Sequence, residues 1–135
     1  MSTQKKIVIV GAEATMTNLL TVLLESDGYQ VSTIHNRDKG NKKLQTDMVD
    51  LIVFDMPPFE TDVVSVVEEL HGMFDAPLII LSAAASRRVT AQVLQAGAAA
   101  YMVKPFSAQK FLDEVAMHVR HNQYAPVAMA SRSIT

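Results

Sequence analysis

The chain has 135 residues, of which 49% are hydrophobic and 19% charged, and its formal net charge is −2. These values predict one globular domain and argue against a disordered chain or a nucleic-acid-binding protein that relies on excess positive charge. The absence of cysteine excludes disulfide scaffolds, thiol catalysis and Cys-ligated metals. The apolar runs are too short to span a membrane, so we expect a cytoplasmic protein that contacts neither membrane nor nucleic acid directly.

Five short apolar runs, most of them rich in valine and isoleucine, are the first structural signal along the chain. Continuous runs of four to six such residues are typical of strands that are buried on both faces of a parallel sheet. The runs cover Ile7–Val10, Tyr29–Ile34, Val49–Phe54, Leu78–Leu81 and Ala98–Val103.

Segments with helical periodicity alternate with these runs. From Met16 to Leu24 the apolar positions recur at intervals of three and four, and the following Asp27-Gly28 predicts the end of that helix. Ser86 and Ser107 are predicted helix N-caps. The remaining periodic segments are Val63–Leu70, Val89–Leu94 and Phe111–Val119, and the polar segment Asp38–Thr46 is predicted as a short helix.

Strand and helix thus alternate five times over residues 1–121. This order predicts an α/β fold, a doubly wound (βα)5 flavodoxin-like three-layer sandwich with a five-stranded parallel sheet. Residues 122–135 show neither the helical nor the strand pattern of apolar residues and are predicted to form a C-terminal tail or the start of a linker.

The ends of four predicted strands carry Gly11, Asp55, Ser82 and Lys104. The carboxyl ends of parallel strands meet at one edge of a sheet, where such folds place their functional groups. A carboxylate, a hydroxyl and an ammonium group together suit the formation and reading of an acyl phosphate.

Three segments in this order resemble the receiver domains of two-component response regulators, over about residues 4–120. The third segment is the most specific, because Gly-Ala, two residues, Tyr, two residues and Lys-Pro-Phe rarely occur together by chance. The segments are Leu51–Asp55 followed by Pro57-Pro58, Ala76–Ala83, and Gly97–Phe106.

The resemblance implies a role for each matching residue. Asp55 corresponds to the phospho-acceptor, Ser82 to the switch hydroxyl, and Lys104 to the lysine that contacts acceptor or phosphoryl oxygen. Tyr101 corresponds to the switch aromatic, and a cis peptide bond is implied before Pro105.

The sequence departs from the family at the magnesium site. Family members end their first strand with two acids that hold Mg²⁺, and Gly11 and Ala12 stand at those positions here. Asp55 and the Pro57 carbonyl remain as ligands, with Glu13 one position beyond the missing pair. Mg²⁺ requires near-octahedral oxygen ligation, so we expect its binding to be weak or absent.

A second departure concerns contacts between molecules. Winged-helix relatives usually carry two acids before the tyrosine of the last strand, where this chain has Ala99-Ala100. The surface formed by the helix after Ser86, the strand to Val103 and the helix after Ser107 still corresponds to the family's contact surface. A protein partner or a second copy is expected there.

Simpler interpretations exist for each candidate residue. Asp55 and Lys104 could form only a structural ion pair, Ser82 could satisfy strand-end backbone groups, and Tyr101 could be an edge aromatic. The four histidines lie in different predicted elements, so no metal site is expected from them.

The main hypothesis is an atypical receiver domain, not an enzyme, that signals through protein contacts without Mg²⁺-dependent phosphorylation and controls a transcriptional output. The alternative is a working receiver that accepts phosphate from a histidine kinase at Asp55, with Glu13 replacing the lost acids. A third class is a small-molecule-binding domain that uses the same crevice.

Overall fold

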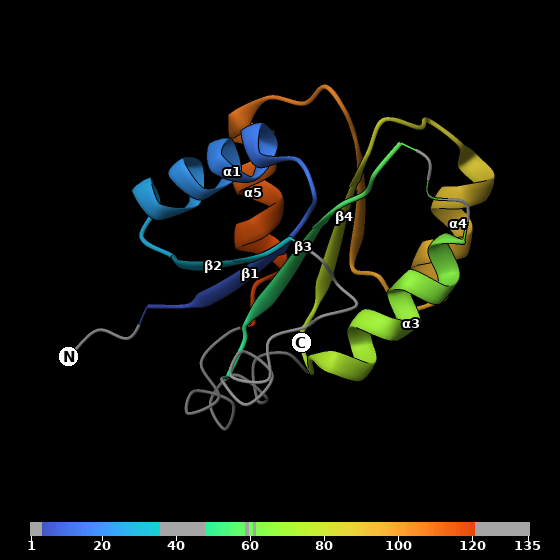
Figure 1. Ribbon diagram of the computed structural model, residues 1–135, viewed down its shortest axis with the longest axis horizontal. Helices are drawn as coiled ribbons and strands as arrows, with labels where there is room; N and C mark the ends of the chain where they lie inside the picture. The colour runs from blue at the N-terminus through green and yellow to red at the C-terminus, as the bar shows by residue number, and fades with distance from the viewer. Residues whose placement is uncertain (1–3, 36–47, 59, 61, 121–135) are drawn as a thin grey trace, which may run out of the picture.

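Five parallel strands form the centre of the computed structural model, which describes residues 4–35, 48–58, 60 and 62–120 (Figure 1). They lie in the order β2-β1-β3-β4-β5. The predicted doubly wound α/β sandwich is therefore confirmed. The strands are β1 Lys6–Val10, β2 Gln30–Ile34, β3 Leu51–Asp55, β4 Leu78–Ser82 and β5 Ala100–Val103.

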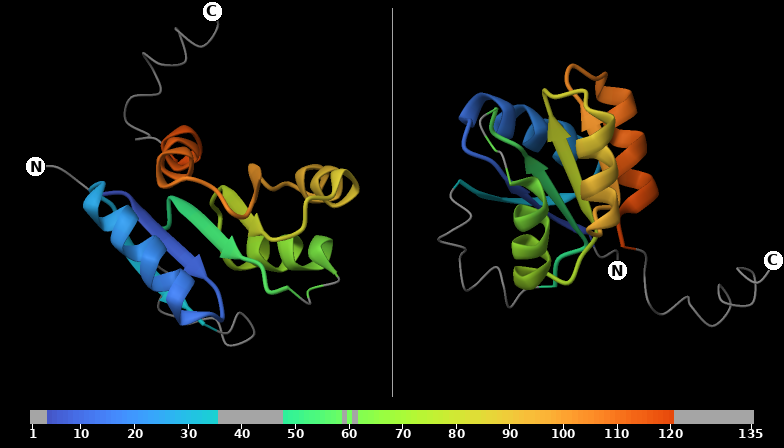
Figure 2. Two further views of the ribbon diagram at one scale, coloured as in Figure 1. Left: turned by 90° about the horizontal axis from the view of Figure 1, so that it is seen from above. Right: turned by 90° about the vertical axis from the view of Figure 1, so that its right-hand side faces the viewer.

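Helices cover both faces of this sheet, with α1 and α5 on one side and α3 and α4 on the other (Figures 1 and 2). None of the helices in the described ranges is both long and apolar enough to cross a bilayer. The helix expected at Asp38–Thr46 and the tail from residue 122 lie outside the described residues. The described helices are α1 Ala14–Ser26, α3 Val63–Met73, α4 Arg87–Gln95 and α5 Ala108–His118.

The continuous apolar runs have a direct structural reason. Successive side chains of a strand point to opposite faces, and here both faces are covered. Ile7 and Ile9 of β1 pack in the cluster under α1 and α5, while Val8 and Val10 pack in the cluster under α3 and α4.

Helix starts follow the predicted capping residues. The Ser86 hydroxyl accepts a hydrogen bond from the Val89 N–H at 3.1 Å, and the Ser107 hydroxyl accepts one from the Lys110 N–H at 3.0 Å. Glu13 occupies the N-cap position of α1, but its side chain makes no capping hydrogen bond. The two helices with a predicted cap, α4 and α5, therefore begin directly after that residue.

Three strands begin later than their apolar runs predict, β2 by one residue and β3 and β5 by two. Ala98 does not join β5, because its N–H closes the end of α4 by donating to the Val93 carbonyl at 3.0 Å. Gly97 permits this ending with a φ of +121°. Asp50 precedes β3, and its carboxylate accepts a hydrogen bond from the Lys6 N–H at 2.8 Å.

Backbone hydrogen bonds continue past the strand ends and hold the site residues together. The Gly11 N–H donates to the Ile34 carbonyl at 3.0 Å, and the Lys104 N–H donates to the Ser82 carbonyl at 2.8 Å. The expected functional residues thus lie along one edge of the sheet.

Candidate functional site

Asp55 and Lys104 form an ion pair at the carboxyl edge of the sheet. The carboxylate belongs to the last residue of the central strand β3 and is only 5% exposed, whereas the lysine directly follows β5 and its side chain is 24% exposed. The ammonium contacts Oδ1, an oxygen that otherwise lies buried without a hydrogen bond from the described residues. A buried carboxylate needs such a partner, because an unpaired charge inside a protein is costly.

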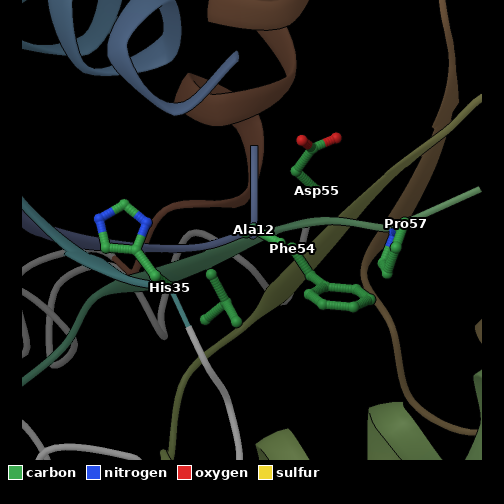
Figure 3. A pocket seen from close by; sticks show the side chains of 7 residues that line it. Ala12, His35, Phe54, Asp55 and Pro57 are labelled. Carbon is green, nitrogen blue, oxygen red and sulfur yellow. The ribbon is translucent and has the colours of Figure 1, made fainter. Parts of the chain in front are cut away.

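A small hollow opens beside Asp55 (Figure 3). In this view the Asp55 carboxylate and the Phe54 ring point to opposite sides of β3, with His35 across the hollow from Pro57. The hollow contains one carboxylate, and most of its wall is apolar or backbone. Its lining residues are Val10, Gly11, Ala12, His35, Phe54, Asp55 and Pro57.

Gly11 is packed too closely for a side chain to be added freely. A Cβ at this position would lie 3.1 Å from the Asp55 Cβ and 3.1 Å from the Thr17 methyl carbon. Thr17 is 1% exposed, and its hydroxyl donates to the Ala14 carbonyl at 3.1 Å and to the Glu13 carbonyl at 3.3 Å. The methyl group is therefore held against Gly11, so the space next to this glycine is already occupied.

The described residues do not fit the magnesium ion that the resemblance implies. Mg²⁺ requires near-octahedral oxygen ligands, and Asp55 is the one carboxylate that lines the hollow. Glu13 is exposed at the start of α1 and is not among the lining residues, whereas Pro57 is. Within the described ranges no three His, Asp or Glu side chains gather as a metal site would require.

Ser82 and Tyr101 meet at one loop residue, Ala84. The Ser82 hydroxyl, 2% exposed, accepts a hydrogen bond from the Ala84 N–H at 3.0 Å. The Tyr101 hydroxyl donates to the Ala84 carbonyl at 2.7 Å, and its ring packs against the cluster under α3 and α4. The loop after β4 thus connects a hydroxyl at the site to a partly buried aromatic ring on β5.

The peptide bond between Lys104 and Pro105 is cis, as the resemblance implies. Among the predicted site residues, the structure brings Asp55 and Lys104 into contact and places Pro57, Gly11 and Ala12 around the same hollow.

Three residues of this region were not predicted as part of it. His35 follows β2, whose neighbour in the sheet is β1, so the rule that strand ends converge would have identified it. Thr17 contributes through packing and Ala84 through its backbone, and neither leaves a signal in the sequence.

Comparison with known proteins gives the same assignment for most of the chain. The family profile described as "Response regulator receiver domain" matches residues 7–116. The transcriptional regulatory protein KdpE of Staphylococcus aureus is 33% identical over 117 residues, which cover 87% of this chain and 49% of that protein. The chain spans about half the length of the curated relatives it matches.

Solved structures share the same architecture. A CheY-like response regulator receiver domain protein from Methanospirillum hungatei superimposes with a TM-score of 0.74 at 24% identity, covering 85% of this chain and 93% of its own. A signal receiver domain of a signal transduction histidine kinase from Syntrophus aciditrophicus gives a TM-score of 0.69 at 27% identity, and the match covers 84% of this chain and 88% of that domain's chain.

Proposed function

This chain belongs to the receiver-domain family of the response regulators, and from that premise we propose that it is an atypical receiver which signals without Mg²⁺-dependent phosphorylation of Asp55. Receiver domains are signalling modules rather than enzymes in the usual sense. The observation that carries the proposal is the carboxyl end of β1, where Gly11 and Ala12 add no side-chain oxygen to the hollow beside Asp55.

Packing around Gly11 supports this proposal. Phosphoryl transfer to a carboxylate brings two negative groups together, and a bound cation normally neutralises that charge. The Thr17 methyl and the Asp55 Cβ occupy the space beside Gly11. A ligand side chain at position 11 would therefore require these neighbours to move.

The ion pair supports the same proposal from the other side of the site. Lys104 already neutralises the Asp55 carboxylate, and the Ser82 hydroxyl is engaged with the Ala84 N–H. The unmodified site is thus electrostatically balanced. A structural ion pair of this kind explains why Asp55 and Lys104 would be retained without the metal.

We propose the surface of α4, β5 and α5, the α4-β5-α5 face, as the contact site for a protein partner or a second copy. It exposes apolar side chains at Leu94 (43%), Val103 (37%) and Met117 (64%). Arg87 and Arg88 at the start of α4 are also exposed. The exposed Asp113 on α5 adds a charge of the opposite sign, and apolar groups bordered by mixed charges suit a partner with a polar rim.

A transcriptional output is part of the proposal. The curated relatives KdpE, PhoP and ResD are all named transcriptional regulatory proteins. Their names describe proteins about twice as long as the matched part, so the output would depend on sequence beyond the receiver domain.

Amide NMR with Mg²⁺, followed by beryllofluoride as a phosphoryl mimic, tests the proposal. We expect no saturable shift at Asp55, Ser82 or Lys104 at millimolar Mg²⁺. Ala12→Asp is the matched control, because position 12 is exposed and lines the hollow, so a carboxylate there can reach the site. Shifts in the unsubstituted protein that spread to Tyr101 would favour a working phospho-receiver instead.

Phosphorylation can also be tested in cells through Asp55→Asn, which removes the acceptor while keeping the shape of the side chain. We expect partner binding and output to persist. If Asp55→Asn abolishes output, and Glu13→Ala does so as well, then Glu13 replaces the lost acids and the atypical assignment is wrong.

A further inference from the structure

Asp50 connects three segments of the chain at the amino edge of the sheet, where the strands begin. Its N–H donates to the Lys6 carbonyl at 2.8 Å, and its carboxylate accepts a hydrogen bond from the Lys6 N–H at 2.8 Å. Its carbonyl accepts one from the Arg120 N–H at 2.9 Å. In Figure 1 the red chain after α5 reaches the start of the green strand β3. One residue thus contacts both the start of β1 and the chain that follows α5.

The Asp50 side chain supplies a bond that the backbone of a parallel pair does not provide. Two residues that exchange both of their hydrogen bonds are typical of antiparallel strands. Strands β1 and β3 are parallel, with Ile7 opposite Leu51. The carboxylate stands in for the second backbone acceptor, so both backbone groups of Lys6 are bound to Asp50.

The end of α5 presents Arg120 to Asp50. The C-cap residue Val119 has φ −59° and ψ 139°, and its N–H donates to the Val115 carbonyl at 2.8 Å. The Val119 side chain is buried in the cluster under α1 and α5. The ion pair of Arg120 with Asp75, at 3.9 Å, adds little because Asp75 is fully exposed. A buried side chain and a backbone hydrogen bond on consecutive residues therefore fix the chain after α5.

We propose that the contacts of Asp50 with Lys6 and Arg120 form an exit clasp, which fixes the last turn of α5 and opens without unfolding the sheet. Asp50 and Arg120 are both partly exposed, whereas the strands between them and the core are buried. Parts of a protein with few buried contacts open at a lower free energy than its core. Release of Arg120 removes the constraint beyond Val119, so the last turn of α5 can fray.

The exit clasp acts on the α4-β5-α5 face from a distance. Met117 is 64% exposed and lies in the turn that the clasp fixes, so opening the clasp would remove it from that face. This consequence rests on the proposed contact site. Asp50 and Asp55 lie at opposite ends of β3, so the clasp is remote from the ion pair and its opening needs no phosphoryl group.

Hydrogen exchange of the full native chain, measured by amide NMR, tests the exit clasp. The Arg120 amide should be protected, yet exchange faster than the Ile80 amide in the centre of β4, which reports global stability. Asp50→Ala should speed exchange of the Lys6 and Arg120 amides together by about two- to tenfold relative to Ile80, the range expected for one hydrogen bond. Asp50→Asn keeps an acceptor oxygen and should restore most of the protection.

Arg120→Pro and Arg120→Ala form a matched pair. Proline removes the N–H donor, and Val119 already has the extended backbone that a residue before proline requires. Alanine keeps the donor and removes only the exposed ion pair. Exchange of the Val119 amide should rise by about two- to tenfold in Arg120→Pro and by less than about twofold in Arg120→Ala.

Two results would overturn the proposal. One is an Asp50→Ala protein in which the Lys6 amide alone exchanges faster, because the three segments would then not be coupled through Asp50. The other is equal exchange of the Val119 amide in Arg120→Pro and Arg120→Ala. These rates are measured without a partner, so a failure of the exit clasp is distinguishable from a failure of the proposed contact site.

Discussion

At the scale of single residues, Thr17 constrains position 11 although it belongs to α1 and does not line the hollow. Its hydroxyl is bound to helix carbonyls at one turn's distance, so the side chain cannot rotate without losing those hydrogen bonds. The methyl group therefore stays against Gly11. A residue of the helix in this way limits which side chains the end of β1 can carry.

This contact gives a measurable coupling between the two positions. Gly11→Ala should lower the free energy of unfolding by about 1–3 kcal/mol, the usual cost of overpacking a well-filled interior. The loss should be smaller in a Thr17→Ser background, because serine keeps the hydroxyl and removes the methyl. Urea denaturation of the unsubstituted protein, Gly11→Ala, Thr17→Ser and the double variant measures the coupling. Effects that add within about 0.3–0.5 kcal/mol would contradict it.

The ion pair gives a second prediction at this scale. Lys104→Met should lower the free energy of unfolding by about 3 kcal/mol, because it leaves the buried Asp55 carboxylate without its partner. Adding Asp55→Asn should recover most of that loss, since the amide carries no charge. Urea denaturation at neutral pH measures the free energy of unfolding of Lys104→Met and of the double variant. If the double variant does not regain stability, Lys104 stabilises the fold by packing instead.

At the scale of elements, α3 has a titratable start. Asp62 is its N-cap, and its carboxylate accepts hydrogen bonds from the Ser65 hydroxyl at 2.8 Å and the Ser65 N–H at 3.2 Å. These bonds, the one from the hydroxyl first, lower the pKa of Asp62 below its ordinary value of 3.8. They favour the ionised carboxylate in the folded chain.

A lowered pKa in the folded state means that the cap stabilises the protein above the ordinary pKa of aspartate. This contribution should disappear as the pH falls through the lowered pKa. The stability difference between the unsubstituted protein and Asp62→Ala should be constant near neutral pH and narrow below about pH 4. Urea denaturation of both proteins across this pH range tests the prediction. A stability difference that does not change with pH would mean that the ionisation of Asp62 does not contribute.

Most elements were predictable because each has a local cause. The strands are buried on both faces and so read as continuous apolar runs, and Ser86 and Ser107 mark helix starts through their own hydrogen bonds. The first residues of the strands were less predictable. Ala98 is apolar and extends the run that becomes β5, but its N–H closes the end of α4 instead. Asp55, Ser82 and Lys104 could be placed together from the convergence of parallel strands. The packing of Thr17 on Gly11 depends on the folded chain alone.

At the scale of the whole molecule, one sheet separates two apolar layers. Neighbouring residues of β4 belong to different layers, since Ile79 packs under α1 and α5 while Ile80 packs under α3 and α4. Both are 0% exposed. Because the same strands support both layers, damage to either should weaken the whole domain.

Ile79→Ala and Ile80→Ala should therefore each lower the free energy of unfolding by about 2–5 kcal/mol and keep a single cooperative transition. Tyr29 packs against the first layer and Tyr101 against the second, so fluorine NMR of fluorotyrosine-labelled protein reports on each separately. Val103→Ala, at a half-exposed position, serves as the mild control. Separate midpoints for the Tyr29 and Tyr101 signals, two of the three tyrosines, would mean that the layers unfold independently.

The packing at Gly11 also limits the order in which a sequence could change. An acid at position 12 would enter an exposed site, whereas an acid at position 11 would first meet the Thr17 methyl. An acid at position 12 therefore needs no rearrangement, whereas an acid at position 11 requires the Thr17 methyl and the Asp55 Cβ to shift. One buried methyl group can thus make two neighbouring positions differ in how readily each accepts a carboxylate.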